Sequence, residues 1–236
     1  MEYDENAMQT VRETRFLIDE YDKWLFNECK PFLGQRILEI GCGLGNQIRY
    51  LLDRELVIGL DNCDDTVSEV KQVFIDFPNI QFSCLSITDP EVTTLETLVI
   101  DTIISFNCLE HIEDDELAIQ NCAKILQPDG KLVLILPAHE WLYGSMDRSI
   151  GHYRRYNKET LSKKLEQNGF NVIQQKYVNL MGALGWYLNG RVLGRKIPPT
   201  SQLRLANKIF PITRKFEDKM EPPVGVSLLT ISSVKA

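Results

Sequence analysis

Short apolar runs alternate with amphipathic segments over much of the chain. The runs are rich in Ile, Leu and Val, and each stops at a glycine, a proline or a polar residue, which predicts buried strands. The predicted strands are residues 35–40, 56–60, 80–85, 102–106 and 131–136. Helical spacing predicts helices between them at residues 46–53, 66–74 and 116–126. Strands that are apolar on both sides and alternate with helices indicate an α/β fold with a mainly parallel sheet.

The segments on either side of this alternation complete the predicted organisation. Apolar residues recur at three- and four-residue steps over residues 10–30, which predicts a helix that ends at Pro31. The later elements are predicted as a polar, aromatic-rich loop at 139–157, a helix at 158–168, a strand at 171–178, a helix near 202–217 and a strand at 227–234. We therefore expect a single domain over 1–236, made of an N-terminal helical part (1–34), a core (35–138) and an elaboration (139–236).

The composition is that of an ordinary globular protein, but its charge is unevenly distributed. The 236 residues are 44% hydrophobic and 25% charged, which excludes a disordered or fibrous chain. The net charge of −7 argues against a general nucleic-acid-coating protein, which needs a basic surface. Residues 1–138 carry a net charge of −16, whereas residues 139–236 carry +9.

Cysteine usage and the absence of export signals predict a cytoplasmic protein. The first ten residues lack the basic and apolar regions of a secretory signal, and the apolar tract 180–193 is too short and too polar, with Asn189 and Arg191, to span a bilayer. The six cysteines contain no CxxC pair, so we expect reduced thiols. No His or Cys pair has zinc-finger spacing, and no metal site is expected.

A glycine-rich segment, residues 41–45, joins the first predicted strand to the first predicted helix. Backbone N–H groups in such a turn approach a ligand closely. A dinucleotide fingerprint needs a glycine where Asn46 stands, and the acidic Glu39 would repel a pyrophosphate but attract an ammonium group. Asp61 follows the second strand, 22 residues after Glu39, where it can accept hydrogen bonds from ribose hydroxyls. These features fit a sulfonium nucleoside amino acid better than a nicotinamide dinucleotide.

With these residues, the sequence resembles the class I S-adenosylmethionine-dependent methyltransferases. The resemblance is carried by the motifs at 37–46, 59–61, 101–112 and 126–132. A loop at 147–156 that contains the letters GHYRRY, together with 185–190 and 225–228, resembles a bacterial small-molecule subgroup of that family. The family implies a Rossmann-like, seven-stranded, mostly parallel sheet with an antiparallel last strand at 227–234, helices on both faces and a helical insertion between the last two strands.

The resemblance also implies the cofactor and the residues that bind it. The cofactor is S-adenosyl-L-methionine, and its product is S-adenosyl-L-homocysteine. The expected cofactor-binding residues are Tyr21, Glu39, Gly41, Cys42, Gly43, Asn46, Asp61, Asn62, Ser86, Ile87, Asn107, Cys108 and Leu109. The family often has Asp where Ser86 stands, so the adenine contact falls to Ser86, a backbone group or Asp89. Tyr21 is either a cofactor contact or, with Trp24, part of the core.

Two loops that follow the fourth and fifth strands carry the candidate catalytic groups. His111 is the first candidate for the base that deprotonates the acceptor, and the alternative is that Glu110 and His111 only cap the next helix. His152 is the second candidate, with Asp147 beside it in the other loop. The expected substrate-binding residues are Glu110, Tyr153, Arg154, Arg155, Tyr156 and Trp186.

The two arginines have two interpretations. Arg154 and Arg155 can bind a carboxylate or phosphate of the acceptor, or Asp147 can hold one of them in an internal ion pair. The apolar segment 181–193 is a substrate lid, a dimer surface or a shallow membrane contact.

The predicted function is methyl transfer to a nitrogen or oxygen of a small-molecule acceptor, a metabolite or natural-product intermediate. The acceptor is either neutral or anionic, and the enzyme is a monomer or a homodimer. The alternatives are a nucleic-acid methyltransferase, although the segment 107–110 lacks the Asp/Asn-Pro-Pro-aromatic motif, and a non-catalytic protein that binds the cofactor.

Overall fold

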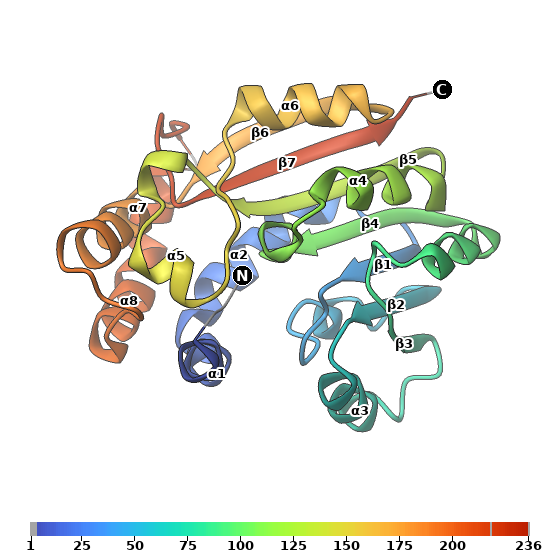
Figure 1. Ribbon diagram of the computed structural model, residues 1–236, viewed down its shortest axis with the longest axis horizontal. Helices are drawn as coiled ribbons and strands as arrows, with labels where there is room; N and C mark the ends of the chain where they lie inside the picture. The colour runs from blue at the N-terminus through green and yellow to red at the C-terminus, as the bar shows by residue number, and fades with distance from the viewer. Residues whose placement is uncertain (1–3, 218, 236) are drawn as a thin grey trace.

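The core of the protein is a seven-stranded sheet (Figure 1). A computed structural model describes residues 4–217 and 219–235. The strands are β1 (Arg36–Ile40), β2 (Leu56–Asp61), β3 (Ile80–Cys84), β4 (Ile100–Phe106), β5 (Leu126–Pro137), β6 (Phe170–Val178) and β7 (Ser227–Val234). Their order is β3-β2-β1-β4-β5-β7-β6, and only β7 runs antiparallel to its neighbours. The predicted Rossmann-like sheet with an antiparallel last strand is confirmed.

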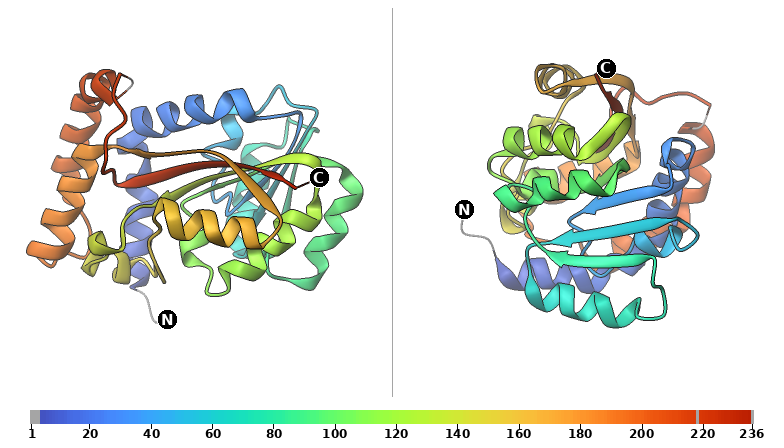
Figure 2. Two further views of the ribbon diagram at one scale, coloured as in Figure 1. Left: turned by 90° about the horizontal axis from the view of Figure 1, so that it is seen from above. Right: turned by 90° about the vertical axis from the view of Figure 1, so that its right-hand side faces the viewer.

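Helices cover both faces of this sheet (Figure 2). The α-helices are α1 (Glu5–Thr14), α2 (Asp19–Cys29), α3 (Asp64–Val73), α4 (Asp115–Ile125), α5 (Ser145–Ser149), α6 (Lys158–Gln167), α7 (Leu180–Trp186) and α8 (Thr200–Glu217). Short 3-10 helices are η1 (Arg15–Ile18), η2 (Lys30–Phe32), η3 (Ile48–Tyr50), η4 (Pro90–Leu98), η5 (Leu109–His111) and η6 (Glu140–Leu142), and a π-helical turn, η7 (Tyr187–Val192), continues α7. In the described ranges no helix is both long and apolar enough to cross a membrane.

Strand alternation builds one apolar core on each face of the sheet. In β1, Leu38 and Ile40 belong to the core under α4 and α6, whereas Ile37 belongs to the core under α2 and α3. Phe210 of α8 joins the second core, with its ring 5.2 Å from that of Tyr21 and 5.3 Å from that of Trp24. The near-continuous apolar strands are therefore explained by burial on both sides.

The segment predicted as one helix at residues 10–30 is two helices with a 3-10 turn between them. The hydroxyl of Thr14 donates to the carbonyl of Thr10 at 2.7 Å, and the hydroxyl of Thr10 donates to that of Asn6 at 2.8 Å. Such bonds to the preceding turn bend helices. The backbone then leaves helical geometry at Ile18, with φ −121° and ψ 26°, before α2 begins.

The helix predicted at residues 46–53 is also wrong, because only the 3-10 turn η3 forms there. The two fully buried side chains of this segment, Ile48 and Leu51, lie three residues apart. One 3-10 turn satisfies that spacing, so no longer helix is needed to bury them. By contrast, the helix at 202–217 is confirmed and begins two residues earlier, as α8.

The carboxyl ends of the parallel strands all point to one side of the molecule (Figure 1). The helices α5, α7 and α8 lie beyond these ends, and α1 lies beside them. Ligands of open α/β sheets bind at this side. The insertion between β6 and β7 therefore stands directly over the expected reaction site.

Candidate active site

The glycine-rich loop after β1 is fastened to the end of β2. The backbone N–H groups of Gly41 and Cys42 both donate to the carbonyl of Leu60, at 2.8 and 2.9 Å. Gly41 has φ +70°, and a Cβ there would lie 2.4 Å from the sulfur of Cys108. Gly43 has φ +50° but faces open space. The loop thus packs against β4 on one side and leaves room for a ligand at Gly43.

Asp61 closes the other side of this loop at the end of β2. Its Oδ2 accepts a hydrogen bond from the N–H of Gly43, and its Oδ1 accepts one from the N–H of Cys63, both at 3.0 Å. These bonds fix the carboxylate beside the glycine loop, in the position from which ribose hydroxyls were expected to be bound. Asn62, next in the chain, is exposed, as is Asn46.

Glu39 is a buried carboxylate whose charge is not compensated. Its side chain is only 3% exposed, and its Oε2 has no hydrogen-bond partner within the described residues. Burial, together with the nearby charge of Asp61, raises the pKa of Glu39 well above its ordinary value. An ammonium group of a ligand would relieve both effects, because it supplies a donor and a positive charge. Glu39 therefore fits the cationic amino-acid end of S-adenosylmethionine.

The predicted adenine contacts form a compact turn after β3. The N–H of Ser86 donates to the Asp89 carboxylate at 2.7 Å, and the Ser86 hydroxyl lies 2.7 Å from that of Thr88. The Ile87 side chain is fully buried, and its carbonyl accepts a bond from Asn121 at 2.8 Å. This turn offers backbone groups and the Ser86 hydroxyl, while the Asp89 carboxylate is used to hold the turn.

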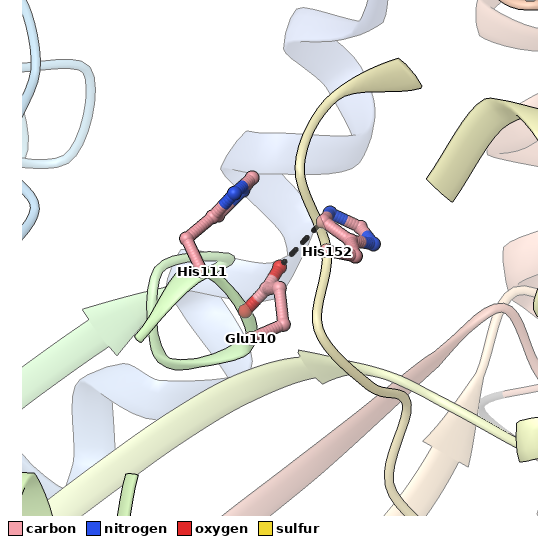
Figure 3. A group of neighbouring side chains, drawn as sticks. All are labelled: Glu110, His111 and His152. Carbon is pink, nitrogen blue, oxygen red and sulfur yellow. Dashed lines mark ion pairs between the residues drawn. The ribbon is translucent and has the colours of Figure 1, made fainter. Parts of the chain in front are cut away.

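The two loops with candidate catalytic groups meet at one place (Figure 3). Glu110 and His111 lie in η5 after β4, and His152 lies in the loop after α5. Glu110 Oε1 is 3.7 Å from His152 Nε2, and the His111 and His152 rings are 4.7 Å apart at 77°. Asn107, with φ +52°, makes the turn between β4 and this cluster, and Leu109 is buried below it.

The side chains of Glu110, His111 and His152 lie close enough together that they could hold a metal ion. One atom each from Glu110, His111 and His152 lies within 4.8 Å of the others. Two imidazoles and a carboxylate are a donor set that divalent transition metals accept. The sequence predicts no metal site, and the same three groups are also suited to proton transfer.

Asp147 organises the second loop from a fully buried position. Its Oδ1 accepts bonds from His152 Nδ1 at 2.8 Å and from Arg155 Nε at 2.7 Å. Its Oδ2 accepts bonds from Trp186 Nε1 at 3.0 Å and from the N–H of Gly144 at 2.9 Å. Burial by itself would raise the pKa of Asp147, but the His152 hydrogen bond and the Arg155 charge bring it below its ordinary value. Asp147 is therefore an ionised carboxylate that orients His152.

The remaining residues of this loop are held within the fold. Arg154 donates to the carbonyls of Ile112 and Glu113, both at 2.7 Å. Tyr156 is buried, and its hydroxyl donates to Asp115 at 2.9 Å, while the hydroxyl of Tyr153 lies 3.4 Å from Glu113. These contacts tie the loop to η5 and to the start of α4.

Arg155 is engaged in the manner of the internal ion pair. Besides its bond to Asp147, it donates to the carbonyl of Ala138 at 2.9 Å, and its guanidinium lies 4.8 Å from the Trp186 ring centroid. Arg155 therefore makes the internal ion pair that was one of the two interpretations, and contact of either arginine with an anionic acceptor stays a prediction. Both guanidinium groups donate to acceptors of the protein: those of Arg155 are buried, whereas those of Arg154 are partly buried or exposed.

A cavity of about 640 Å³ opens beside this cluster. Its polar wall contains Glu110, His111, His152 and Asn107, and Arg155, Trp186 and Tyr21 also line it. The Tyr21 hydroxyl donates to Ser227 at 2.9 Å, and its ring belongs to the second core, so it serves both as a wall and as packing. The expected cofactor residues of β1 to β3 lie outside this lining.

The apolar wall of the cavity comes partly from the segment 181–193, for which a substrate lid is one of the predicted roles, and partly from residues of α8 that the sequence did not single out. They belong to α7, η7 and α8 and include Met181, Leu184, Leu188, Leu203, Leu205 and Ile209. Two contacts keep these helices together: Glu217 accepts bonds from the N–H groups of Asn179 and Leu180, and Asn189 donates to Gln202 at 2.8 Å. The sequence could have indicated the α8 residues of this wall, because the predicted helix 202–217 has apolar residues on two sides.

The pH dependence of the protein's stability tests the electrostatic environment of Glu110. Burial raises the pKa of Glu110 to about 6, although the charges of His152 and Arg155 oppose this shift. A folded-state pKa above the unfolded value means that stability falls as pH rises from about 4.5 to about 6 and stays lower above it. We expect Glu110→Gln to raise the free energy of unfolding at pH 8 by up to about 2 kcal/mol and to change it little at pH 4.5.

Chemical denaturation at the two pH values measures this difference. Glu116→Gln, at an exposed carboxylate of α4, is the matched control and should change neither value. Equal stability of Glu110→Gln and wild type at pH 8 would contradict a raised pKa at Glu110.

This site and fold define a class I S-adenosylmethionine-dependent methyltransferase. The features that define it are the strand order, the glycine-rich loop fastened to β2, the carboxylates Glu39 and Asp61, and the cluster of Glu110, His111 and His152. The profile of a family described as a methyltransferase domain matches residues 9–175, and the chain belongs to this family. The match runs from α1 through the loop that follows β5 and α6 into β6.

Relatives of known name share part of the chain. A probable S-adenosylmethionine-dependent methyltransferase of Mycolicibacterium smegmatis is 28% identical over 144 residues, covering 59% of this chain and 53% of its own. The mitochondrial ubiquinone biosynthesis O-methyltransferase of Bos taurus is 27% identical over 162 residues, covering 61% and 43%. The chain thus spans about half the length of these curated relatives.

Solved structures with little sequence identity share the fold. The 1,6-didemethyltoxoflavin-N1-methyltransferase of Burkholderia thailandensis, solved with 1,6-didemethyltoxoflavin and S-adenosylhomocysteine, has a TM-score of 0.61 at 14% identity, covering 98% of this chain and 85% of its own. The [4+2]-cyclase SpnF has a TM-score of 0.60 at 16% identity, covering 92% and 82%. Because one of these neighbours is named a cyclase, the fold by itself does not define the reaction.

Proposed function

We propose that this protein transfers the methyl group of S-adenosylmethionine to an oxygen or nitrogen atom of an amphipathic small molecule. One observation carries the proposal: Glu110, His111 and His152 line the same cavity as the apolar side chains of α7 and α8. A proton acceptor at the end of an apolar chamber suits an acceptor that joins a protonated nucleophile to an apolar ring or chain.

The cofactor would be held by the carboxyl ends of β1 and β2. Glu39 would bind its ammonium group, Asp61 its ribose, and the backbone at Gly43 would lie against it. When bound, S-adenosylmethionine supplies a methyl group on a sulfonium, which is already reactive toward a lone pair. What remains for the protein is to align the acceptor, exclude water and remove its proton.

The histidine cluster is arranged for that proton. Because ionised Asp147 can only accept, His152 donates from Nδ1, and its Nε2 then faces Glu110. His111 lines the cavity next to this pair. We assign proton acceptance to His111, and we assign to His152 and Glu110 the positioning of the acceptor and the balance of charge around it.

The nature of the acceptor follows from the cavity walls. Leu184, Leu188 and Leu203 give the chamber an apolar surface in addition to the polar wall, which supports a ring or chain in the acceptor. The mitochondrial relative is named for ubiquinone biosynthesis, and this too supports an acceptor with a phenolic oxygen and an apolar substituent. Arg155 lines the cavity while it is bonded to Asp147, so an anionic acceptor remains a second option.

The test is a methyl-transfer assay with a series of catechols that carry alkyl chains of increasing length. We expect kcat/KM to rise with chain length and Gly185→Phe to remove this dependence, because Gly185 lines the cavity and has open space around it. Formation of S-adenosylhomocysteine is the readout. Each buried methylene contributes about 0.8 kcal/mol, so the gain is roughly fourfold for each one.

Two controls make the result specific. Val73→Phe changes an exposed position of α3, far from the cavity, and should keep the dependence on chain length. Equal turnover of short and long acceptors would overturn the amphipathic acceptor, whereas absence of S-adenosylhomocysteine binding in a titration would overturn the methyl transfer itself. A hydroxybenzoate series in the same assay tests the anionic option.

A further inference from the structure

The outer face of α8 carries a stripe of exposed apolar side chains. Leu205, Ile209, Ile212 and Phe216 follow the i, i+4, i+7, i+11 spacing of one helix face and are 57%, 38%, 61% and 70% exposed. The opposite face of α8 packs on α2 through Phe210. A contiguous exposed apolar surface on a protein usually marks an interaction site.

The stripe continues onto α7 and η7. Leu184 and Leu188 are 57% and 47% exposed, and the next two apolar residues, Val192 and Leu193, are 59% and 50% exposed. Leu184, Leu188, Leu205 and Ile209 also line the cavity described above. The exposed apolar surface of α7, η7 and α8 therefore surrounds the opening of the cavity.

Positive charge flanks this apolar surface. Residues 180–220 contain eight Lys and Arg but only two Asp and Glu, in contrast to the net charge of −16 over residues 1–138. On α8, the exposed Arg204, Lys208 and Lys215 lie along one side of the apolar stripe. A helix with an apolar face and basic residues beside it is suited to the interface of an anionic bilayer, where long basic side chains reach the headgroups.

We propose that α7, η7 and α8 dock on the surface of an anionic lipid bilayer and that the cavity opens toward the acyl chains. The apolar stripe enters the headgroup boundary, and Arg204, Lys208 and Lys215 contact the anionic headgroups. A second copy of the chain fits this surface less well, because two such faces would bring their positive charges together. The proposal goes beyond the proposed function, since it concerns where the enzyme meets an amphipathic acceptor.

The experiment is vesicle flotation of the full chain, which involves no methyl transfer. The probes are vesicles of phosphatidylcholine alone and of an equimolar mixture with phosphatidylglycerol. We expect binding to the mixed vesicles that weakens at high salt, and a loss of at least about tenfold for Ile212→Glu/Phe216→Glu, which adds charge to the stripe outside the cavity lining. The double substitution Lys208→Glu/Lys215→Glu should also weaken binding to the mixed vesicles.

Ile75→Glu is the matched control: Ile75 is 70% exposed and directly follows α3, which lies apart from α7 and α8 in Figure 1, so its substitution should leave binding unchanged. Unchanged titration of S-adenosylhomocysteine shows that each variant is folded. Failure of the wild type to float with the mixed vesicles, or equal flotation of Ile212→Glu/Phe216→Glu, would overturn the proposal. A wild-type dimer that Ile212→Glu/Phe216→Glu converts to monomers in analytical ultracentrifugation would also overturn it, because the occupant would then be a second copy.

Discussion

Glu39→Gln should weaken the binding of S-adenosylmethionine by about 10- to 100-fold and at the same time make the ligand-free protein more stable. The two effects have one cause, which is a buried carboxylate with an unpartnered oxygen. In the ligand-free protein this charge is costly, and in the complex it pairs with an ammonium group.

The pH dependence has a definite sign. Because burial and Asp61 raise the pKa of Glu39 well above its unfolded value, the folded protein holds a proton that the unfolded chain has lost. Stability of the ligand-free wild type therefore falls as pH rises above the ordinary range of a glutamate, and Glu39→Gln removes this part of the fall.

Isothermal titration with S-adenosylmethionine and chemical denaturation at several pH values measure the two effects. Glu55→Gln, at an exposed residue paired with Arg36, is the control and should change neither. If Glu39→Gln left the dissociation constant unchanged, Glu39 would not contact the ammonium group. If it lowered stability at neutral pH, the buried charge would have an internal partner.

Asp147→Asn should cost about 3–5 kcal/mol of stability, because it removes the buried carboxylate charge that is hydrogen-bonded to the guanidinium of Arg155. Arg155 is 5% exposed, and Asp147 is fully buried. The amide keeps the shape of the carboxylate, so packing is preserved and the effect measures charge. The same substitution replaces a group that can only accept with an amide that can also donate, so His152 Nδ1 no longer has to carry the proton, and methyl transfer should fall with a changed pH profile.

A double substitution separates charge from packing. Asp147→Asn with Arg155→Met should recover much of the lost stability, because replacing a buried ion pair with an apolar side chain is often neutral. Activity should stay low, since His152 still lacks its orienting carboxylate. Thermal unfolding and the pH dependence of kcat/KM are the two measurements. A stability loss below about 1 kcal/mol for Asp147→Asn alone would place this pair among weak surface interactions instead.

Much of the expected cofactor site could be predicted, because its residues are close together in the sequence. Glu39, the glycine-rich loop and Asp61 lie within 23 consecutive residues, and parallel strands bring their carboxyl ends to one edge. The strands followed from the apolar runs, whereas the antiparallel last strand was implied by the family resemblance. The helix predicted at 46–53 failed because its two buried residues, Ile48 and Leu51, need only one turn, and periodicity over so short a segment does not distinguish the two.

The arrangement of the groups expected to meet the acceptor could not be predicted, because it depends on contacts between segments far apart in the chain. Glu110 and His152 are 42 residues apart in the chain, and only the fold brings their side chains to 3.7 Å. The ion pair between Arg155 and Asp147 likewise becomes visible only in the fold, because the sequence offers either arginine as the partner.

The sequence by itself determined the class of fold and the cofactor, and it predicted cofactor-binding residues and candidate bases, because these motifs consist of residues that are neighbours along a strand or turn. Only the tertiary structure decided which apolar face of α8 is buried. The helix has apolar residues on two sides, and the side with Phe210 packs on α2 while the side with Ile212 and Phe216 stays exposed. Helical spacing identifies both faces equally, and packing free energy with a distant helix selects between them.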